Sequence, residues 1–586
     1  MIGAGAKAPA PVASGPGRAV SGSFTEEVAV GEDRTDDRSS DAATASSRGG
    51  DRHDLPSGAD LVVIGAGSAG SAFAARLAER PGRTVLLVEA GPDPTQLGGA
   101  SAAALTDAST LVAAYSPTVS AGVRVDLGDD RSTEMRLGRV VGGSGAVNGA
   151  YFLRGRPVDF DRWAARGNLG WSAAEVQCSF ERLEHDLDLG DRPGHGDRGP
   201  VPVQRELRLS GVTDAFFAAC EHLGHMELDD LNGPAGPTDG DRSGCAVGGA
   251  EIAGAEDGGG RFGVVPRNAR GSERVGAATA YFGTRRTPPG PLVIAGRSVR
   301  RVLLRGGRAT GVELVGIGGV HVVEVAEVVL SAGALGSPEL LRRSGIGPAD
   351  ELRAAGIEVV HDAPGLGTAM FDHPCIDLMY RPGDGVLQPS SRGFFQGALH
   401  LRAGVEILAT RVPYGVATGR DLGDELLSLR VTLMRTSSRG RLHLRGTTPP
   451  GAARSETTIS YGSLATADDR ALARVAVRAA CSIAVTPAFG PLVAQWFGPE
   501  TDDLCSDDRL DAWIRAHLGT AFHPCGTAPM GRAADPLAVV DEQLRVHGIE
   551  GLRVVDTSIV PEPLSRGPAA TAIMIGEHAA AMFPDS

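Results

Sequence analysis

The segment AFHPCGTAPMG, residues 521–531, places one histidine beside a proline, a cysteine and a run of small residues. A side chain of this type can serve three kinds of chemistry. His523 could be a hydrogen-bonded core histidine, a metal ligand together with Cys525, or a general base whose small neighbours leave room for a flat cofactor. Imidazole suits the last role because its ordinary pKa, about 6.5, lets it exchange a proton near neutral pH.

The metal interpretation has a second observation behind it, since the tripeptide HPC occurs at residues 373–375 and again at residues 523–525. His373, Cys375, His523 and Cys525 would nominally make a Cys2His2 set. However, a proline separates each histidine from its cysteine, and the spacing matches none of the usual zinc sites. The sequence therefore predicts no metal here, and it leaves the core and catalytic interpretations open.

A dinucleotide signal lies in residues 60–91, DLVVIGAGSAGSAFAARLAERPGRTVLLVEAG. Residues 61–64 and 84–88 predict strands, and the alanine-rich stretch between them predicts a helix that ends near residue 79. The pattern G-x-G-x-x-G lets the backbone approach a pyrophosphate at the helix N-terminus, and the following glutamate can accept hydrogen bonds from both ribose hydroxyls. The unit does not separate NAD from FAD. The predicted contacts are Gly65, Gly67, Ser68, Ala69, Gly70, Glu89 and Ala90.

Residues 138–163, GRVVGGSGAVNGAYFLRGRPVDFDRW, bear on which dinucleotide is bound. Paired glycines are followed by Ser144, Gly145 and Asn148, which makes a surface lined by backbone with few side chains in the way. Such a surface suits the edge and face of a ring cofactor, and the plain alternative is a turn-rich loop. On these residues alone both interpretations stay open.

At this point the sequence resembles the glucose–methanol–choline (GMC) family of FAD-dependent oxidoreductases. Residues 138–163 are similar to the family's first signature, and GALGSPELLRRSGIG, residues 333–347, is similar to the second. APGLGTAMFDHP, residues 363–374, and residues 523–561 extend the likeness, which runs collinearly from residue 59 to about residue 583. It implies a mixed α/β (α+β) fold, in which a Rossmann-type FAD-binding domain joins a discontinuous substrate domain with an antiparallel sheet.

The resemblance also divides the chain into parts. Residues 59–170, 240–375 and 516–586 are expected to form the discontinuous FAD-binding domain, and residues 171–239 and 376–515 the substrate-binding domain. Residues 1–58 are rich in Gly, Ala, Ser, Pro and Asp without apolar periodicity, so they are expected to be a disordered N-terminal extension.

Carried over residue by residue, the resemblance assigns further cofactor contacts. Val299 is expected to meet the adenine, and Ala332 and Asp556 other parts of the cofactor. Val147 stands where some members carry a histidine bonded covalently to the flavin, so the FAD is expected to be non-covalent. The positions expected near the flavin and its pyrophosphate are Gly143, Ser144, Asn148, Gly149 and Ala150.

The resemblance decides the role expected of His523, which falls on the family's active-site histidine. The implied reaction takes the hydroxyl proton of an alcohol at His523 while the carbinol carbon passes hydride to flavin N5. The second side chain that the family usually offers, Asn or His, is replaced here by Gly567, and Ser565 or Arg566 are candidate substitutes. Gly567 and Pro568 are expected to start an apolar helix that points its N-terminus at the flavin's pyrimidine end, with Pro568 and Ala569 among the cofactor-binding residues.

Several stretches are more similar to the GMC dehydrogenases associated with mycofactocin, a peptide-derived redox cofactor, above all PLSRGPAAT at residues 563–571. This narrower likeness implies oxidation of reduced mycofactocin, with electrons passing toward a respiratory chain as the acceptor. A generic choline-type or alcohol-type oxidase or dehydrogenase is the alternative. A flavin-binding electron carrier without alcohol chemistry is a third hypothesis, because Asn or His is missing at Gly567. Some members carry a histidine where this chain has Ala569, and its absence here puts a replacement catalytic partner in doubt.

Bulk composition limits the partners. The chain has 586 residues, 42% of them hydrophobic, and a formal net charge of -14, which argues against nucleic acid or an anionic membrane as the main partner. Neither an uncharged apolar run long enough to span a membrane nor a signal peptide is predicted. The seven scattered cysteines suit reduced thiols. The expected location is the cytoplasm, with peripheral contact to the inner face of the membrane as an alternative.

Overall fold

The computed structural model describes residues 58–206, 209–233, 259–285, 290–316, 319–387, 393–418, 425–444 and 457–584. All of these belong to one compact unit, His53–Ser586. The extension expected over residues 1–58 lies outside the described residues except for Gly58, and Cys245 also lies outside them.

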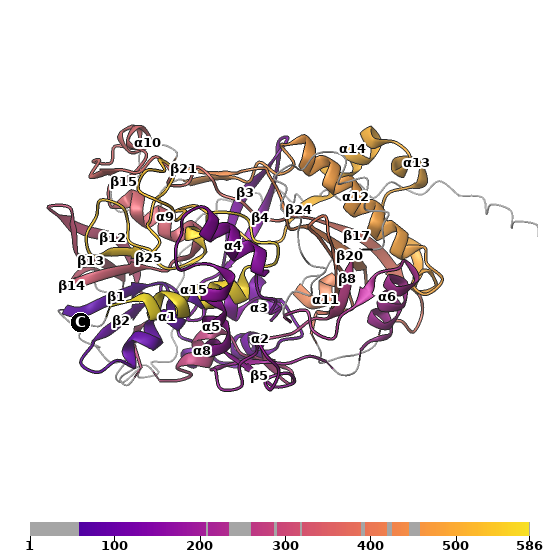
Figure 1. Ribbon diagram of the computed structural model, residues 1–586, viewed down its shortest axis with the longest axis horizontal. Coiled ribbons are helices and arrows are strands. Elements are labelled where there is room, and N and C mark those ends of the chain that lie inside the picture. The colour runs from indigo at the N-terminus through magenta and orange to yellow at the C-terminus, as the bar shows by residue number, and fades with distance from the viewer. Residues whose placement is uncertain are drawn as a thin grey trace, which may run out of the picture. The chain divides into compact units, whose positions relative to one another are not determined.

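The first sheet has seven strands and is built around the dinucleotide motif (Figure 1). Its order is β11-β2-β1-β14-β13-β12, and β25 pairs with β14. The neighbours of β1, β2 and β25 run parallel, whereas β12, β13 and β14 form an antiparallel meander. All four residues of β2 are buried, as expected for a parallel strand covered on both faces. The strands are β1 (Gly58–Ile64), β2 (Val85–Val88), β11 (Leu292–Ile294), β12 (Ser298–Arg305), β13 (Arg308–Gly316), β14 (Gly319–Leu330) and β25 (Leu552–Val554).

Two helices from opposite ends of the chain pack together beside this sheet. α1 (Ser68–Ala78) follows β1, and the C-terminal helix α15 (Ala569–Met582) lies against it. A Cβ atom at Gly576 would lie 2.2 Å from the carbonyl oxygen of Ala69, so this close crossing needs glycine. The first turn of the dinucleotide helix and the C-terminal segment are thereby brought into one layer.

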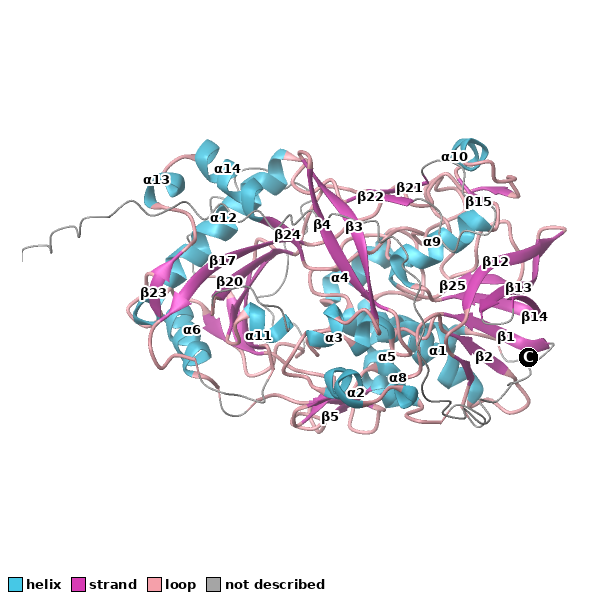
Figure 2. Cartoon of the chain, turned by 180° about the vertical axis from the view of Figure 1, so that it is seen from behind, coloured by secondary structure: helices cyan, strands magenta, loops and turns pink. Residues whose placement is uncertain are grey.

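The second sheet has eight strands in the order β23-β17-β20-β19-β18-β8-β7, with β24 paired to β17 (Figure 2). In β20, Leu427, Leu429 and Val431 belong to the apolar core that also contains residues of α12 (Ala467–Ala484) and α6 (Gly211–His222). Side chains alternate along a strand, so Arg430 faces the other side of the sheet. The strands are β7 (Met226–Glu227), β8 (Arg261–Val264), β17 (Pro374–Pro382), β18 (Phe395–Leu401), β19 (Val405–Thr410), β20 (Leu427–Leu433), β23 (Val493–Trp496) and β24 (Leu518–Thr520).

A long hairpin, β3 (Ser120–Gly128) and β4 (Arg131–Gly138), forms a third, four-stranded sheet with β21 and β22. In Figure 2 this hairpin crosses between the two larger sheets, and β4 leads directly into the glycine-rich segment that starts at residue 138. The other helices are α2 (Gly99–Thr106), α3 (Val112–Tyr115), α4 (Pro157–Ala165), α5 (Ala173–Leu183), α8 (Ala277–Tyr281), α9 (Gly333–Arg343), α10 (Ala349–Ala354), α11 (Tyr414–Thr418), α13 (Thr501–Leu504) and α14 (Asp507–His517). The other strands are β5 (Glu184–Asp186), β6 (Val201–Val203), β9 (Ala269–Arg270), β10 (Glu273–Arg274), β15 (Ile346–Gly347), β16 (His361–Asp362), β21 (Arg441–Leu444) and β22 (Thr457–Ser460).

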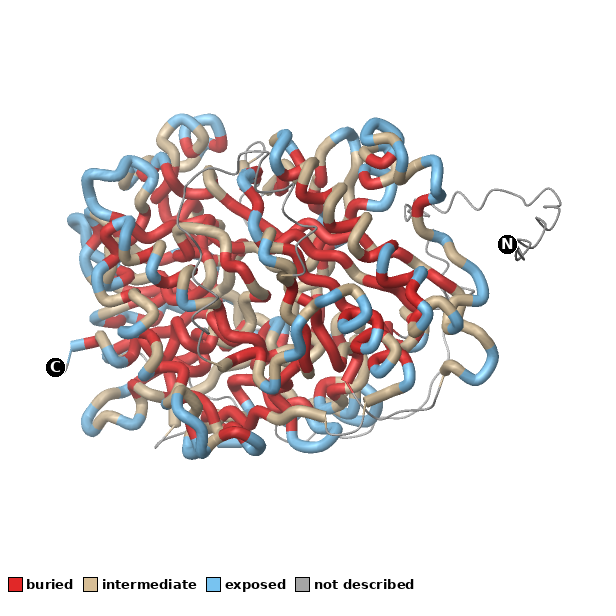
Figure 3. Tube along the Cα trace, turned by 45° about the vertical axis from the view of Figure 1, so that its right-hand side comes forward, coloured by how far each residue is buried: buried red, intermediate tan, exposed pale blue. Residues whose placement is uncertain are grey.

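The predicted mixed α/β architecture is confirmed, with one largely parallel and one largely antiparallel sheet. Buried residues fill the interior around both sheets, and exposed residues gather at the loops (Figure 3). β8 departs from the expected division, because it pairs with β18 in the second sheet although residues 240–375 were assigned to the FAD-binding part. Among the described residues, no helix has the length and apolar character needed to cross a membrane.

Candidate active site

The turn after β1 is shaped to hold a phosphate group. Gly65 has φ +104°, and a Cβ atom there would lie 2.3 Å from the carbonyl oxygen of Ser331. A Cβ atom at Gly70 would lie 2.1 Å from the carbonyl oxygen of Gly65, whereas a Cβ atom at Gly67 would meet nothing within 4 Å. Two glycines are therefore required by packing, and the third borders open space. That space lies at the start of α1, where the first N–H groups have no carbonyl earlier in the helix to bond.

Glu89 is positioned by the backbone around it. Its two carboxylate oxygens accept hydrogen bonds from the backbone N–H groups of Ala66, at 3.0 Å, and Gly91, at 2.8 Å. Burial raises the pKa of Glu89, and these backbone donors oppose the rise. The carboxylate is thus held at the end of β2 beside the glycine turn, which is the place that a ribose of a bound dinucleotide requires.

The second glycine-rich segment packs directly onto the first. The short 3-10 helix η2 (Gly143–Ala146) follows Gly142, whose N–H donates to the carbonyl oxygen of Ala66 at 2.7 Å. A Cβ atom at Gly143 would lie 2.7 Å from the Cα atom of Gly67. The two predicted cofactor loops, far apart in the chain, therefore border the same space.

The end of this segment is a strained turn. Asn148 uses its side-chain oxygen to accept the N–H of Ala150 at 2.9 Å. Ala150 adopts φ +55°, which is unfavourable for a residue with a Cβ atom. Strain of this kind is common where backbone must approach a ligand. Ser144 accepts the N–H of Gly138 through its hydroxyl, so it braces the segment from the other end.

Residues close in sequence to two predicted contacts, Val299 and Ala332, are hydrogen-bonded near the C-terminal ends of β2 and β1. The N–H of Arg297, two residues before Val299, donates to the carbonyl oxygen of Glu89 at 3.0 Å. The N–H of Ser331, next to Ala332, donates to the carbonyl oxygen of Ile64 at 2.7 Å.

Asp556 accepts the N–H of Gly333 at 2.9 Å and also accepts the hydroxyls of Ser337 and Ser558. Its carboxylate is therefore engaged in bracing the start of α9. A contact from Asp556 to a cofactor would have to come from its backbone.

His523 lies in the loop after β24, next to a strained residue. Phe522 has φ +61° and is 38% exposed. The backbone N–H of His523 donates to a carboxylate oxygen of Asp372 at 2.7 Å, and the hydroxyl of Thr520 donates to the other oxygen. Burial raises the pKa of Asp372 to about 7. This carboxyl group therefore holds the backbone of His523, not its ring.

The ring of His523 contacts a second histidine and the start of α15. Nδ1 of His523 lies 2.9 Å from Nδ1 of His373, and the two rings are edge to face. A Cβ atom at Gly567 would lie 3.3 Å from Nε2 of His523, so this nitrogen faces the loop before α15. Burial, His373 and Arg430 all lower the pKa of His523 well below its ordinary value. The imidazole is therefore neutral at neutral pH, with one ring nitrogen unprotonated.

The candidate substitutes for the absent Asn or His at Gly567 are used elsewhere. Ser565 donates both its N–H and its hydroxyl to Asp159, at 3.0 and 2.7 Å. Arg566 donates to the carbonyl oxygen of Leu231. Among the described contacts, His523 therefore meets the glycine at 567 rather than either neighbouring side chain.

α15 starts one residue later than expected. Pro568 is the N-cap, and Ala569 is the first helical residue. The first-turn N–H groups of this helix have no earlier carbonyl within it, so its positive end is free to stabilise negative charge. Thr571, in the same turn, is fully buried, and its hydroxyl has no partner among the described residues.

The HPC repeats do not assemble a metal site. The two histidines meet through Nδ1 atoms at hydrogen-bond distance, and the thiol of Cys375 donates to the carbonyl oxygen of Thr520. Burial raises the pKa of Cys525 far above its usual range, so the thiol stays protonated. The six described cysteines are free, as expected for reduced thiols.

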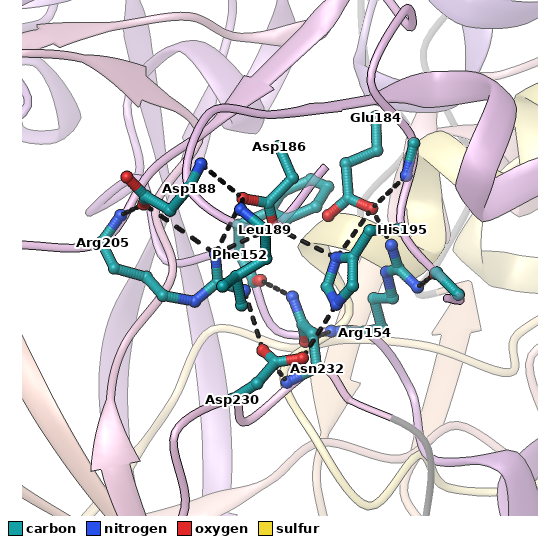
Figure 4. Close-up of polar contacts among 12 residues, drawn as sticks. Phe152, Arg154, Glu184, Asp186, Asp188, Leu189, His195, Arg205, Asp230 and Asn232 are labelled. Carbon is teal, nitrogen blue, oxygen red and sulfur yellow. Dashed lines mark hydrogen bonds and ion pairs between the residues drawn. The ribbon is translucent and has the colours of Figure 1, made fainter. Parts of the chain in front are cut away.

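Sequence reasoning missed a buried charged cluster, defined by Arg154, Glu184, Asp186, His195, Arg205 and Asp230 (Figure 4). Nδ1 of His195 lies 3.1 Å from Asp186, and Nε2 lies 2.8 Å from Asp230. Glu184, Asp186 and His195 bring ligand atoms within 4.8 Å of one another, which resembles a metal site.

Two arginines decide how the charged cluster is balanced. Arg154 pairs with Glu184, and Arg205 pairs with both Asp186 and Asp230. The six defined residues hold three carboxylates, two guanidiniums and His195, and Asp188 adds a fourth carboxylate 3.9 Å from Arg205. The carboxylates are thus paired with arginine and histidine in an ion-pair cluster. Its members lie on separate segments, so no local motif could reveal it.

The sequence profile of GMC oxidoreductases matches the chain in two blocks, the N-terminal profile over residues 59–375 and the C-terminal profile over residues 436–576. The chain belongs to the GMC oxidoreductase family. As a GMC oxidoreductase it is an FAD-dependent enzyme of the class that acts on CH–OH donors. The glycine cradle, the free helix N-terminus and the oriented Glu89 fit that cofactor.

Similar proteins cover about nine tenths of this GMC oxidoreductase. An uncharacterized GMC-type oxidoreductase of Rhodococcus erythropolis is 33% identical over 540 residues, covering 90% of this chain and 98% of that protein. An oxygen-dependent choline dehydrogenase of Brucella anthropi is 33% identical over 560 residues, covering 89% and 94%. Among solved structures, pyridoxine 4-oxidase from Mesorbium loti has a TM-score of 0.77 at 28% identity, covering 90% of this chain and 99% of its own. A fungal aryl-alcohol oxidase, at 22% identity and TM-score 0.71, shares the fold.

Proposed function

We propose that this GMC oxidoreductase oxidises an alcohol to a carbonyl compound, with His523 as the catalytic base. The hydroxyl proton goes to the His523 ring, and the carbinol carbon loses hydride as the C=O bond forms, so two electrons leave the alcohol. The observation that supports this most directly is the neutral imidazole of His523 held against the start of α15 at Gly567.

The residues proposed to hold non-covalent FAD are those of the two glycine-rich loops, Glu89 and the segments around Val299, Ala332 and Asp556. When bound, FAD accepts the hydride at N5. Val147 is buried at the position where a covalent bond to histidine would otherwise be made, and valine cannot make it.

Groups of the chain itself position the base His523 and stabilise the negative charge that develops during the reaction. Asp372 fixes the backbone of His523, which limits how far its ring moves relative to an alcohol. Pro568 and Ala569 place the positive end of α15 beside that ring, and backbone N–H groups there stabilise developing negative charge without any side chain at Gly567.

For the substrate, we propose reduced mycofactocin, with electrons passed toward the respiratory chain from the cytoplasmic side of the membrane. The support is the similarity of PLSRGPAAT, residues 563–571, to the dehydrogenases associated with mycofactocin, including Gly567 and Pro568. The second candidate is a small alcohol such as choline, which is favoured by the 33% identity to oxygen-dependent choline dehydrogenase.

Anaerobic stopped-flow reduction of the purified yellow protein tests the proposal. Wild type mixed with a mycofactocinol should lose its flavin absorbance, whereas His523→Ala should lose it at least about a hundredfold more slowly, since general-base catalysis contributes about 10²–10⁴. The control is His517→Gln, an exposed histidine on α14. A change of less than about tenfold in His523→Ala would favour an electron carrier instead. Steady hydrogen peroxide production with choline would favour the second candidate.

A further inference from the structure

The hydrogen bonds around His373 fix where its proton lies. Nε2 of His373 is 2.9 Å from the carbonyl oxygen of Leu564. A carbonyl oxygen can only accept a hydrogen bond, so Nε2 of His373 must carry hydrogen. The side chain is fully buried, and burial lowers its pKa, so the ring is neutral. Nδ1 of His373 therefore carries a lone pair and no hydrogen.

This assignment determines the tautomer of His523. The two Nδ1 atoms lie 2.9 Å apart, which is a hydrogen bond only if one of them donates. Because Nδ1 of His373 has no hydrogen, the donor is Nδ1 of His523. A neutral His523 then has its lone pair on Nε2, the nitrogen that faces Gly567.

We propose that His373 is a positioning residue that sets the tautomer of His523, so that Nε2 of His523 is the atom that takes the alcohol proton. The proposal rests on the function proposed above. The proposal deepens that function by naming Nε2 of His523 as the reacting atom and His373 as the residue that selects this atom.

The arrangement suits a base that must start neutral. When Nε2 gains the proton, Nδ1 of His523 already donates to His373, so the imidazolium forms without any rearrangement of this contact. A carboxylate in place of His373 would hold His523 in its charged form, whereas a neutral imidazole does not.

The neighbouring charges fit the same role. Asp372 binds the backbone of His523, and Arg430 on β20 opposes a positive charge on the ring. The pairing of β17 with β24 joins Pro374 to Thr520 and so keeps the two histidines adjacent.

Two substitutions separate this role from a merely structural one. Asparagine at 373 can keep an acceptor near Nδ1, so His373→Asn should reduce the flavin within about fivefold of wild type. Glutamine can keep a donor near Nε2, so His373→Gln preserves the link to Leu564 but loses the acceptor. Its rate should fall about a hundredfold, in the range of general-base effects, with FAD content unchanged. Equal rates in the two variants, or a faster glutamine variant, would overturn the proposal.

A measurement on unmodified holoenzyme covers the case in which both variants fold poorly. Ring-15N histidine labelling, with His523 assigned by its loss in His523→Gln, should report an unprotonated Nε2 and a protonated Nδ1. The opposite shifts would refute the tautomer. If His523→Ala reduces its flavin normally, the proposed function fails, but the 15N shifts still report on the pairing by themselves.

Discussion

Adding one methyl group at Gly567 should displace the catalytic base by a calculable amount. The Cβ atom of Gly567→Ala would lie 3.2 Å from Cε1 and 3.3 Å from Nε2 of His523. Comfortable contact needs about 3.6–3.8 Å, so the closer contact makes the ring retreat by about 0.4–0.6 Å. A misplacement of about 1 Å costs about a hundredfold in rate, so this shift corresponds to about six- to sixteenfold.

The assay is the limiting rate of anaerobic flavin reduction at saturating alcohol, with FAD affinity measured in parallel. Gly567 does not have a positive φ, so alanine introduces contact and no backbone strain. The matched control is Gly211→Ala, at the exposed start of α6, where a Cβ atom meets nothing within 4 Å. A Gly567→Ala enzyme that reduces its flavin at the wild-type rate would refute the placement of His523 against this loop.

Three further predictions concern cofactor binding and pH. Glu89→Gln should weaken FAD binding about tenfold or more, because a hydrogen bond to a charged group is worth about 1.5–3 kcal/mol; flavin fluorescence titration measures this, and Glu79→Gln on exposed α1 surface should match wild type. Burial lowers the pKa of His195, but its carboxylate partners raise it overall. Protonated His195 therefore stabilises the folded state fully below pH about 6.5, and this contribution is lost as pH rises through the folded-state pKa. Thermal unfolding of wild type should therefore shift down between pH 6.5 and 9 more than that of His195→Gln; parallel shifts would contradict the charged cluster. Asp372 has a pKa raised by burial to about 7, so the native state holds its proton and wild-type stability falls from pH about 4 to 7. In urea titrations, the free energy of unfolding of Asp372→Asn should not fall over this pH range. The same pH dependence in variant and wild type would contradict the raised pKa of Asp372.

Much of the fold could be predicted because its signals are local. Residues 61–64 and 84–88 alternate with a glycine turn and an alanine-rich helix, and β1, α1 and β2 follow that order, with bounds within three residues of those predicted. β8 shows the limit of such reasoning. Its antiparallel partner β18 lies more than a hundred residues away, and nothing in its own four residues indicates which sheet it joins.

The sequence by itself determined the chemistry of single positions: the glycines of the turn, the acid at Glu89, the histidine at 523 and the missing side chain at Gly567. The glycines and the acid are recognised from their immediate neighbours in the chain, whereas the roles of His523 and Gly567 were expected only from the resemblance to the GMC family. Tertiary structure alone decided the pairings: His373 with His523, 150 positions apart, and Ser565 with Asp159, 406 positions apart. Hydrogen-bond donors and acceptors are assigned only when both partners are in place, so the tautomer of the base and the charge of the His195 cluster follow from the folded chain.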